Sequence, residues 1–307
     1  MKKRWLAGFL CITFFLMMVT GCGQAQTSSI VSDAAATDWP VKVENVNLTK
    51  EPAGVAVLSG NIADILLKLR YETILKARSE DCSQNELSSL PVYSLDQAKE
   101  LKNLGVDLAL TDQMPTPDQT KAFSDVGVVL LSFLPADGRA DLSRLYTEVG
   151  TAVKGARTGY EQGVKMAEQV LMGIDSVAWI IPNKNILLTG IYVSDIDGSV
   201  VTGDMFQNSI LESAGVTNVA AGSEGGKMDL TALKRANPQV IFCPFGLKEK
   251  LENADIFEGL SAVKEGRVYE IDPNYMKWQG ETVMFAVTEI AGFAYPELKQ
   301  TGSSSVS

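Results

Sequence analysis

The feature that most strongly constrains the fold of this chain is a repeated alternation of short apolar segments with helical patterns. The alternation occurs in two series, and one long helical stretch separates them. The first series predicts strands at 55–58, 73–77, 106–110 and 128–133, and helices at 62–69, 96–104 and 117–126. The second series predicts strands at 186–193, 240–243 and 267–271, and helices at 205–214, 229–236 and 281–294. Strands that alternate with helices indicate parallel sheets covered on both faces. The sequence therefore predicts an α/β protein with two lobes.

The stretch between the two series reads as one helix. Apolar residues recur at helical spacing from Leu142 to Leu171, and no proline interrupts them. A single helix over about residues 141–175 is predicted to join an N-terminal lobe (46–140) to a C-terminal lobe (176–298). Gly155, Gly159 and Gly163 recur one turn apart, and charged neighbours argue against a membrane helix. We expect these glycines to allow close packing against a lobe.

The N-terminus has the order of a secretory signal. Three basic residues precede an apolar run from Trp5 to Val19, which is too short to span a membrane comfortably. The run ends in Thr20-Gly21-Cys22, which resembles the cleavage site of bacterial lipoprotein signals. That resemblance implies a signal peptide at 1–21 and lipidation of Cys22, whereas the alternative is an ordinary signal peptide with a chance cysteine. Residues 22–45 are predicted to be a flexible tether and 299–307 a disordered tail.

Composition excludes several classes of function. The chain has 27 basic and 37 acidic residues, and loss of the three basic residues of the signal leaves a net charge of −13. Such acidity disfavours nucleic acid as a partner and adhesion to anionic lipid, so the acyl chains would have to hold the protein at the membrane. The sequence contains no histidine, which argues against a Ser-His-Asp hydrolase, a zinc enzyme or a histidine-ligated haem carrier. We predict no cofactor, no metal site and no enzymatic activity.

Three segments of the C-terminal half resemble a known family when they are taken in order. They are the run from Leu211 through Ala214-Gly215-Val216-Thr217-Asn218, the segment Asn237-Pro238-Gln239-Val240-Ile241, and the segment Ala262-Val263-Lys264-Glu265-Gly266-Arg267-Val268-Tyr269. The order and spacing resemble those of the substrate-binding proteins of iron-siderophore and vitamin B12 ABC importers. The resemblance covers about residues 50–297 and implies the class III periplasmic-binding-protein fold. It further implies a lipid-anchored, monomeric protein outside the cytoplasmic membrane that passes a small-molecule ligand to an ABC permease.

The loops after the strands are the predicted ligand site, because ligands of open α/β sheets bind beyond the carboxyl ends of the strands. The candidate ligand-binding residues on or beside these loops are Asn61, Arg78, Gln113, Phe133, Tyr192, Lys227, Phe245, Tyr275 and Trp278. A loop aromatic is about as often part of its own lobe's core, and a loop lysine is usually solvated. The segment 274–280 is the strongest candidate, since it combines two aromatic residues, a methionine and a lysine. Few basic residues lie on these loops, which favours a weakly charged iron-hydroxamate or a corrinoid over an anionic ferric catecholate.

Other motifs leave alternatives open. Members of the family usually carry a glutamate on the outside of each lobe for permease docking, and the corresponding positions here fall near Asp96 and Asp229. Because the usual glutamates are missing at these positions, a sensor or structural lipoprotein of the same fold is kept as an alternative. An extracellular enzyme would have to use carboxylates such as Asp195, Asp197 and Asp204. The glycine-rich segment 222–227 lacks the phosphate-loop pattern and is predicted to be a turn.

The two remaining cysteines, Cys82 and Cys243, follow or end predicted strands, so we expect them near the rim of the ligand cleft. A disulfide needs Cα atoms within about 7 Å, and cleft walls are usually farther apart. We therefore predict two free thiols.

Overall fold

A computed structural model describes residues 37–182 and 187–298. The predicted signal peptide, Cys22, most of the predicted tether and the predicted tail at 299–307 lie outside the described residues. Part of the predicted tether is nevertheless structured, because residues 41–43 form a strand. This strand, β1 (Val41–Val43), pairs antiparallel with β2 (Val46–Leu48). Val43 and Leu48 bury their side chains against the first lobe, which explains why this polar segment is ordered.

The first lobe is built on a four-stranded parallel sheet of order β4-β3-β5-β6. Its strands are β3 (Val55–Val57), β4 (Leu75–Arg78), β5 (Leu108–Thr111) and β6 (Val129–Ser132). Its helices are α1 (Gly60–Lys68), α2 (Ala98–Asn103) and α3 (Pro117–Asp125), with single 3-10 turns at Glu72–Ile74 and Asn85–Leu87. Successive residues of β3 point into different core clusters, as expected for a sheet covered on both faces.

The second lobe repeats this plan with a parallel sheet of order β10-β9-β7-β8. Its strands are β7 (Leu188–Tyr192), β8 (Val216–Asn218), β9 (Val240–Pro244) and β10 (Val268–Ile271). Its helices are α6 (Phe206–Ser213), α7 (Leu230–Ala236), α8 (Lys248–Glu252), α9 (Asp255–Glu258), α10 (Ser261–Lys264) and α11 (Thr282–Ala294). The α/β prediction with two mainly parallel sheets is confirmed, although the short elements β8 and α8 to α10 were not predicted.

The prediction of one helix over 141–175 is wrong, because the segment forms two helices. They are α4 (Arg139–Lys154) and α5 (Thr158–Ile180). The chain breaks at Gly155, whose φ of +90° ends α4 in a conformation that favours glycine. Asp38 then starts α5, since its carboxylate accepts the backbone N–H groups of Arg157 and Thr158 at 3.0 and 2.6 Å. These hydrogen bonds also hold the pKa of Asp38 below its usual value.

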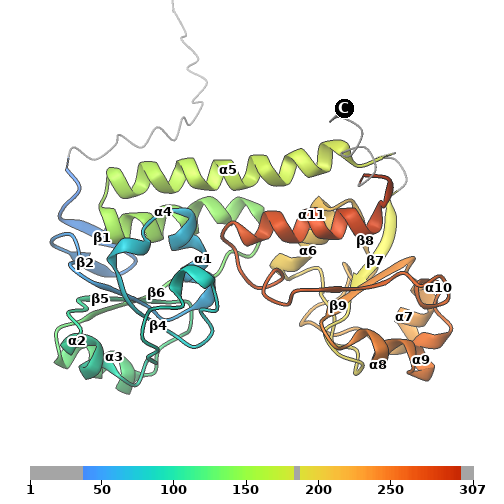
Figure 1. Cartoon of the computed structure of the whole chain (residues 1–307), viewed down its shortest axis with the longest axis horizontal. Helices are drawn as coiled ribbons and strands as arrows, with labels where there is room; N and C mark the ends of the chain where they lie inside the picture. The colour runs from blue at the N-terminus through green and yellow to red at the C-terminus, as the bar shows by residue number, and fades with distance from the viewer. Residues whose placement is uncertain (1–36, 183–186, 299–307) are drawn as a thin grey trace, which may run out of the picture. The chain divides into compact units, whose positions relative to one another are not determined.

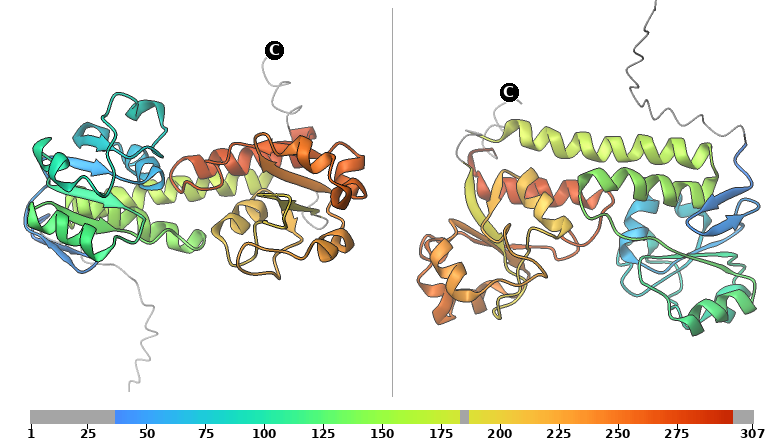
Figure 2. Two further views of the ribbon diagram at one scale, coloured as in Figure 1. Left: turned by 90° about the horizontal axis from the view of Figure 1, so that it is seen from below. Right: turned by 180° about the vertical axis from the view of Figure 1, so that it is seen from behind.

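Helix α5 is the element that connects the two lobes, as Figures 1 and 2 show. Its first half runs beside α4 and its second half contacts α11 and α6. Gly159 and Gly163 lie directly against the backbone of α4, so these two glycines do allow close packing, but of one helix on another and not of a helix on a lobe as predicted. One large core cluster extends from the first lobe along α4 and α5 to α11, while a smaller cluster fills the outer face of each sheet.

Candidate functional site

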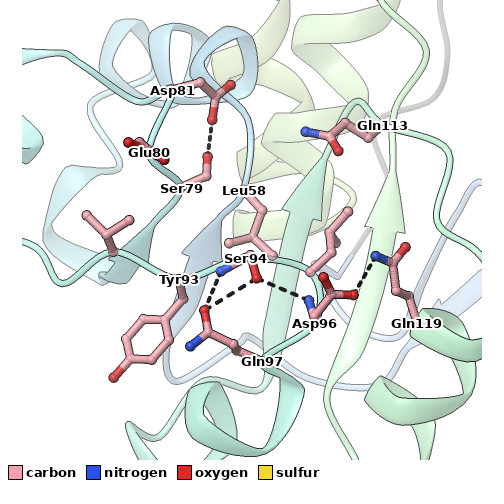
Figure 3. Close-up of a pocket in the computed structure, with 12 residues that line it drawn as sticks. Leu58, Ser79, Glu80, Asp81, Tyr93, Ser94, Asp96, Gln97, Gln113 and Gln119 are labelled. Carbon is pink, nitrogen blue, oxygen red and sulfur yellow. Dashed lines mark hydrogen bonds between the residues drawn. The ribbon is translucent and has the colours of Figure 1, made fainter.

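A hollow of about 720 Å³ opens in the first lobe, where the strands of its sheet end. Its walls come from the segments that follow β3, β4 and β5, and from helix α3 (Figure 3). This is the edge of a parallel sheet at which ligands of α/β proteins bind. The residues that line it are Leu58, Ser79, Glu80, Asp81, Val92, Tyr93, Ser94, Leu95, Asp96, Gln97, Gln113 and Gln119.

The loop after β4 is fixed to the start of α1. The carboxylate of Asp81 accepts the backbone N–H of Gly60 at 2.8 Å and also accepts the hydroxyl of Ser79. The Arg78 guanidinium donates to the carbonyl oxygens of Ser79 and Cys82 at 3.2 and 3.0 Å, so it braces this loop from behind. Arg78 was predicted to contact ligand, but it is absent from the residues that line the hollow. The loop therefore presents Ser79, Glu80 and Asp81 on a rigid base.

A second wall is held by side-chain amides. Gln97 accepts the backbone N–H of Ser94 at 2.9 Å, which shapes the turn before α2. Gln119 donates to Asp96 at 2.9 Å, and its own position is set by a capping box with Thr116 at the start of α3. Asp96, the predicted docking residue of the first lobe, thus lies in the wall of the hollow.

Three polar side chains of the hollow have unused hydrogen-bonding groups. Across residues 37–182 and 187–298, no hydrogen bond or ion pair engages the Glu80 carboxylate, the Tyr93 hydroxyl or the Gln113 side-chain amide. Gln113 was predicted as a ligand contact, and it lines the same hollow as Glu80 and Tyr93, each on a different side (Figure 3). Such groups can bind a polar ligand without first breaking protein contacts.

The predicted residues of the second lobe are more dispersed. Phe245 follows β9 with 63% of its surface exposed, whereas Tyr192 is buried at the end of β7, where burial raises the pKa of its hydroxyl. Lys227 donates to the carboxylate of Asp197 at 2.6 Å and to the Ser199 hydroxyl at 2.7 Å. Its ammonium group therefore joins the loop after β7 to the glycine-rich segment 222–227, and the same bond lowers the pKa of Asp197 to about 2.

The segment 274–280 contacts the first lobe as well as its own, and Gln279 makes most of the hydrogen bonds that cross between them. The Oε1 of Gln279 accepts two hydrogen bonds from the first lobe. One comes from the side-chain amide of Asn61 at 3.4 Å, and the other comes from the backbone N–H of Ala136 at 2.8 Å. It donates its own backbone N–H to Asn61 Oδ1 at 2.8 Å and its Nε2 to the Ala136 carbonyl at 2.7 Å. Asn61, predicted on a ligand loop, lies instead in the first turn of α1 and is 6% exposed. The pair Asn61 and Gln279 joins the lobes.

The aromatic side chains of this segment are partly used in packing. The ring of Tyr275 lies 6.1 Å from that of Phe285 on α11. The Trp278 indole lies against Gly60, where an added methyl group would be 2.8 Å from its Nε1. Both rings are half-buried, and Trp278 is placed beside the loop of Asp81 that lines the hollow.

Two further expectations about the site are wrong. Phe133, expected as a stacking surface, has no exposed surface and lies in the large core cluster. Cys82 and Cys243 are free thiols as predicted, but each is buried in the core of its own lobe and not at a cleft rim. Burial raises the pKa of both thiols, and that of Cys243 to about 12.

Sequence reasoning missed the exposed aliphatic side chains at this edge of each sheet. In the first lobe they are Val92, Met114 and Leu134, which are 49%, 82% and 63% exposed. In the second lobe Ile196 is 41% exposed beside the carboxyl end of β7. Three of these residues, Met114, Leu134 and Ile196, lie on loops that follow strands, where the ligand site was predicted. A search of the loops for any apolar residue, and not for aromatic or basic residues alone, would have found those that lie on them.

Within the described parts of the chain, no three His, Cys, Asp or Glu side chains converge on a metal site. Over the same residues, no helix has the length and apolar character needed to cross a membrane.

Comparison with known proteins agrees with the fold. No protein-family model matches the sequence. The chain is 26% identical over 315 residues to an uncharacterized ABC transporter substrate-binding lipoprotein, YvrC, of Bacillus subtilis, covering 97% of this chain and 99% of that protein. Among solved structures, the periplasmic heme-binding protein BhuT in complex with two hemes is 19% identical with a TM-score of 0.67, over 81% of this chain and all of BhuT.

A possible iron-binding periplasmic solute-binding protein of Staphylococcus epidermidis is 15% identical with a TM-score of 0.66, over 80% of this chain and all of that one. The fold is therefore that of the class III periplasmic binding proteins, and the sequence is similar to that of an ABC transporter substrate-binding lipoprotein along nearly its whole length.

Proposed function

We propose that this chain, a homologue of ABC transporter substrate-binding lipoproteins with the class III fold, captures a hydroxamate-type iron-siderophore or a corrinoid and delivers it to an ABC importer. The observation that carries the proposal is the hollow of about 720 Å³ at the carboxyl ends of the first sheet. Its volume lies in the range of small-molecule sites, and its walls offer amides, hydroxyls, one tyrosine and three carboxylates.

The choice of cargo follows from the chemistry of these walls. Ferric catecholates are strongly anionic, and haem carries two propionates, so both need convergent arginine or lysine side chains. The residues that line the hollow include neither, and the predicted Lys227 is paired with Asp197. Neutral hydroxamate chelates and corrinoids need mainly hydrogen-bonding and apolar walls, which Gln113 and Tyr93 with the apolar Leu58, Val92 and Leu95 can supply.

Anchoring and docking complete the proposal. We propose that acyl chains on Cys22 hold the protein on the outer face of the cytoplasmic membrane, which is supported by the signal sequence and by the lipoprotein relative. We further propose that Asp96 and Asp229 meet the permease. Asp229 caps α7 by accepting the backbone N–H of Ala232 at 2.8 Å, so a docking role would be added to a structural one.

Two other functions compete with this one. A sensor or structural lipoprotein of the same fold would bind ligand without supporting uptake, and an enzyme would turn over its substrate. The enzyme is the weaker alternative because two of the three carboxylates predicted for it, Asp197 and Asp204, already hold loops of the second lobe together. Asp197 binds Lys227 and Ser199, and Asp204 accepts the N–H of Gly225 at 2.9 Å.

Native mass spectrometry with a panel of ferric trihydroxamates, ferric tricatecholates, haem and corrinoids tests the proposal directly. We expect one complex of 1:1 stoichiometry with a trihydroxamate or a corrinoid and no mass change of the cargo after incubation. Binding of haem or a tricatecholate alone would contradict the assigned cargo class. Chemical conversion of the cargo would favour an enzyme.

A further inference from the structure

We infer that the hollow of the first lobe selects a cargo that carries positive charge, such as a ferric chelate with a free ammonium group. This inference rests on the proposed function, because it names the charge of the ligand that the same site takes. The structural basis is a wall with three carboxylates and no basic side chain. These carboxylates belong to Glu80, Asp81 and Asp96.

Three basic side chains on the neighbouring elements are engaged elsewhere, and Lys76 of β4 and Lys99 of α2 do not line the hollow. Arg78 directs its guanidinium to the carbonyl oxygens of Ser79 and Cys82. Lys102 of α2 donates to the carbonyl of Gly127 at 3.2 Å, and Lys121 of α3 pairs with Asp125 at 2.6 Å. The carboxylates of the hollow therefore have no protein cation in hydrogen-bonding contact within the described residues.

The three carboxylates differ in what they can still accept. Asp81 already binds Gly60 and Ser79, and it fixes the loop. The Asp96 carboxylate accepts one hydrogen bond, from Gln119 to its Oδ1, and within residues 37–182 and 187–298 its Oδ2 has no hydrogen-bond partner. Glu80 has no partner among the described residues, and it shares the hollow with the unengaged Tyr93 hydroxyl and Gln113 amide. An ammonium group donates hydrogen bonds, and the Glu80 carboxylate is the wall group best able to accept one.

The expected size of the effect follows from exposure. Glu80 and Asp96 are solvent-exposed in the described structure, so water and salt screen their attraction for a cation. An exposed ion pair changes affinity by up to about fivefold. Hydrogen bonds to charged groups are stronger than neutral ones, so a ligand that forms one with a wall carboxylate would show a larger change in affinity than this. The charge preference should therefore be severalfold and should weaken in high salt.

The experiment compares two probes that differ only in one charge. Ferrioxamine B carries a pendant ammonium group, and its N-acetylated form keeps the same iron coordination without that charge. Binding of each probe to the wild-type protein is measured by quenching of tryptophan fluorescence at low salt and again at about 1 M salt, where the Debye length is about 3 Å. We expect ferrioxamine B to bind about fivefold more tightly at low salt, and the difference to shrink at high salt.

Glu80→Gln is the test variant, since no hydrogen bond or ion pair from the described residues engages this side chain. Glu100→Gln, an exposed α2 position outside the hollow, is the matched control with the same chemical change. We expect Glu80→Gln to remove most of the preference for ferrioxamine B and Glu100→Gln to retain it. Equal binding of the two probes by the wild-type protein, or an unchanged ratio in Glu80→Gln, would overturn the inference while leaving the proposed function in place. If neither probe binds and a corrinoid or an anionic chelate does, the hydroxamate assignment and this inference both fail.

Discussion

Replacement of Asp64 by asparagine should stabilise the protein at neutral pH. Asp64 lies in α1 and is 6% exposed, and its Oδ2 accepts the backbone N–H groups of Gly280 and Thr282 at 2.8 and 3.2 Å. It thereby joins the first lobe to the start of α11. The nearby Lys68 pairs with Glu281 at 2.8 Å, so no basic side chain among the described residues pairs with Asp64 itself.

The magnitude follows from the pKa of Asp64. Burial, which outweighs the hydrogen bonds from Thr282 and Gly280, raises this pKa from 3.8 to about 6. The folded protein therefore binds the Asp64 proton more tightly than the unfolded chain does. The stabilisation by the protonated form is complete below about pH 4 and is lost as the pH rises through about 6. A pKa difference of about 2 corresponds to a loss of about 3 kcal/mol from the free energy of unfolding, at about 1.4 kcal/mol per pKa unit.

Asparagine has no charge to bury, and its amide oxygen can still accept the two backbone N–H groups. We expect Asp64→Asn to raise the free energy of unfolding by about 2–3 kcal/mol at pH 8 and to have little effect at pH 4. Urea unfolding between pH 4 and pH 8, followed by tryptophan fluorescence and circular dichroism together, measures this difference. Coincidence of the two signals checks that the transition is two-state.

Two variants separate the loss of buried charge from the loss of hydrogen bonds. Asp64→Ala leaves the N–H groups of Gly280 and Thr282 without an acceptor, and we expect it to be destabilising at every pH. Asp141→Asn should show the opposite pH dependence, because the hydrogen bond from Arg144 lowers the pKa of Asp141. Its contribution is present at neutral pH and is lost on acidification. If Asp64→Asn were as destabilising as Asp64→Ala at pH 8, or if its pH profile matched that of wild type, the reasoning would be refuted.

Three further predictions concern packing and anchoring. Gly159→Ala should lower the free energy of unfolding by about 1–3 kcal/mol, because the new methyl group meets the backbone of α4. Gly222→Ala is the control and should not lower it, because the space around Gly222 is open. Thermal unfolding of the two variants measures the difference. Phe133→Ala should cost about 3–5 kcal/mol as a core truncation, and Phe245→Ala should change stability by no more than about 0.5 kcal/mol; equal effects of the two would contradict the assigned burial. Cys22→Ala should abolish incorporation of radiolabelled palmitate into the protein expressed in bacteria, and the absence of label in the wild type would disprove the anchor.

Periodicity predicted most of the fold because the buried faces of strands and helices require apolar residues at regular spacings in the sequence. The strands 55–57 and 108–111 and the capped helix α3 were found in this way. The break between α4 and α5 was not, because both helices keep their apolar spacing across it. The break depends on the positive φ of Gly155 and on a cap from Asp38, more than a hundred residues earlier in the chain.

The site was predicted at the level of loops but not of side chains. The rule that ligands bind beyond the carboxyl ends of the strands led to Gln113 and to the loop that contains Glu80. It could not separate Phe133, which is buried, from Phe245, which is exposed, since both follow a strand. Nor could it show that Asn61 and Gln279, 218 residues apart, bind each other and join the lobes. Those assignments depend on tertiary contacts that have no local signature.

Uptake of a radiolabelled iron chelate or corrinoid, identified by the binding panel, tests the central claim most directly. The measurement compares the bacterium that encodes this chain with a strain from which its gene has been deleted and with the deletion strain complemented by the wild-type gene. The proposed function predicts that uptake at low concentration is lost on deletion and restored by complementation. Unchanged uptake in the deletion strain, with tight binding to the purified protein, would contradict delivery to an importer and would favour a sensor of the same fold.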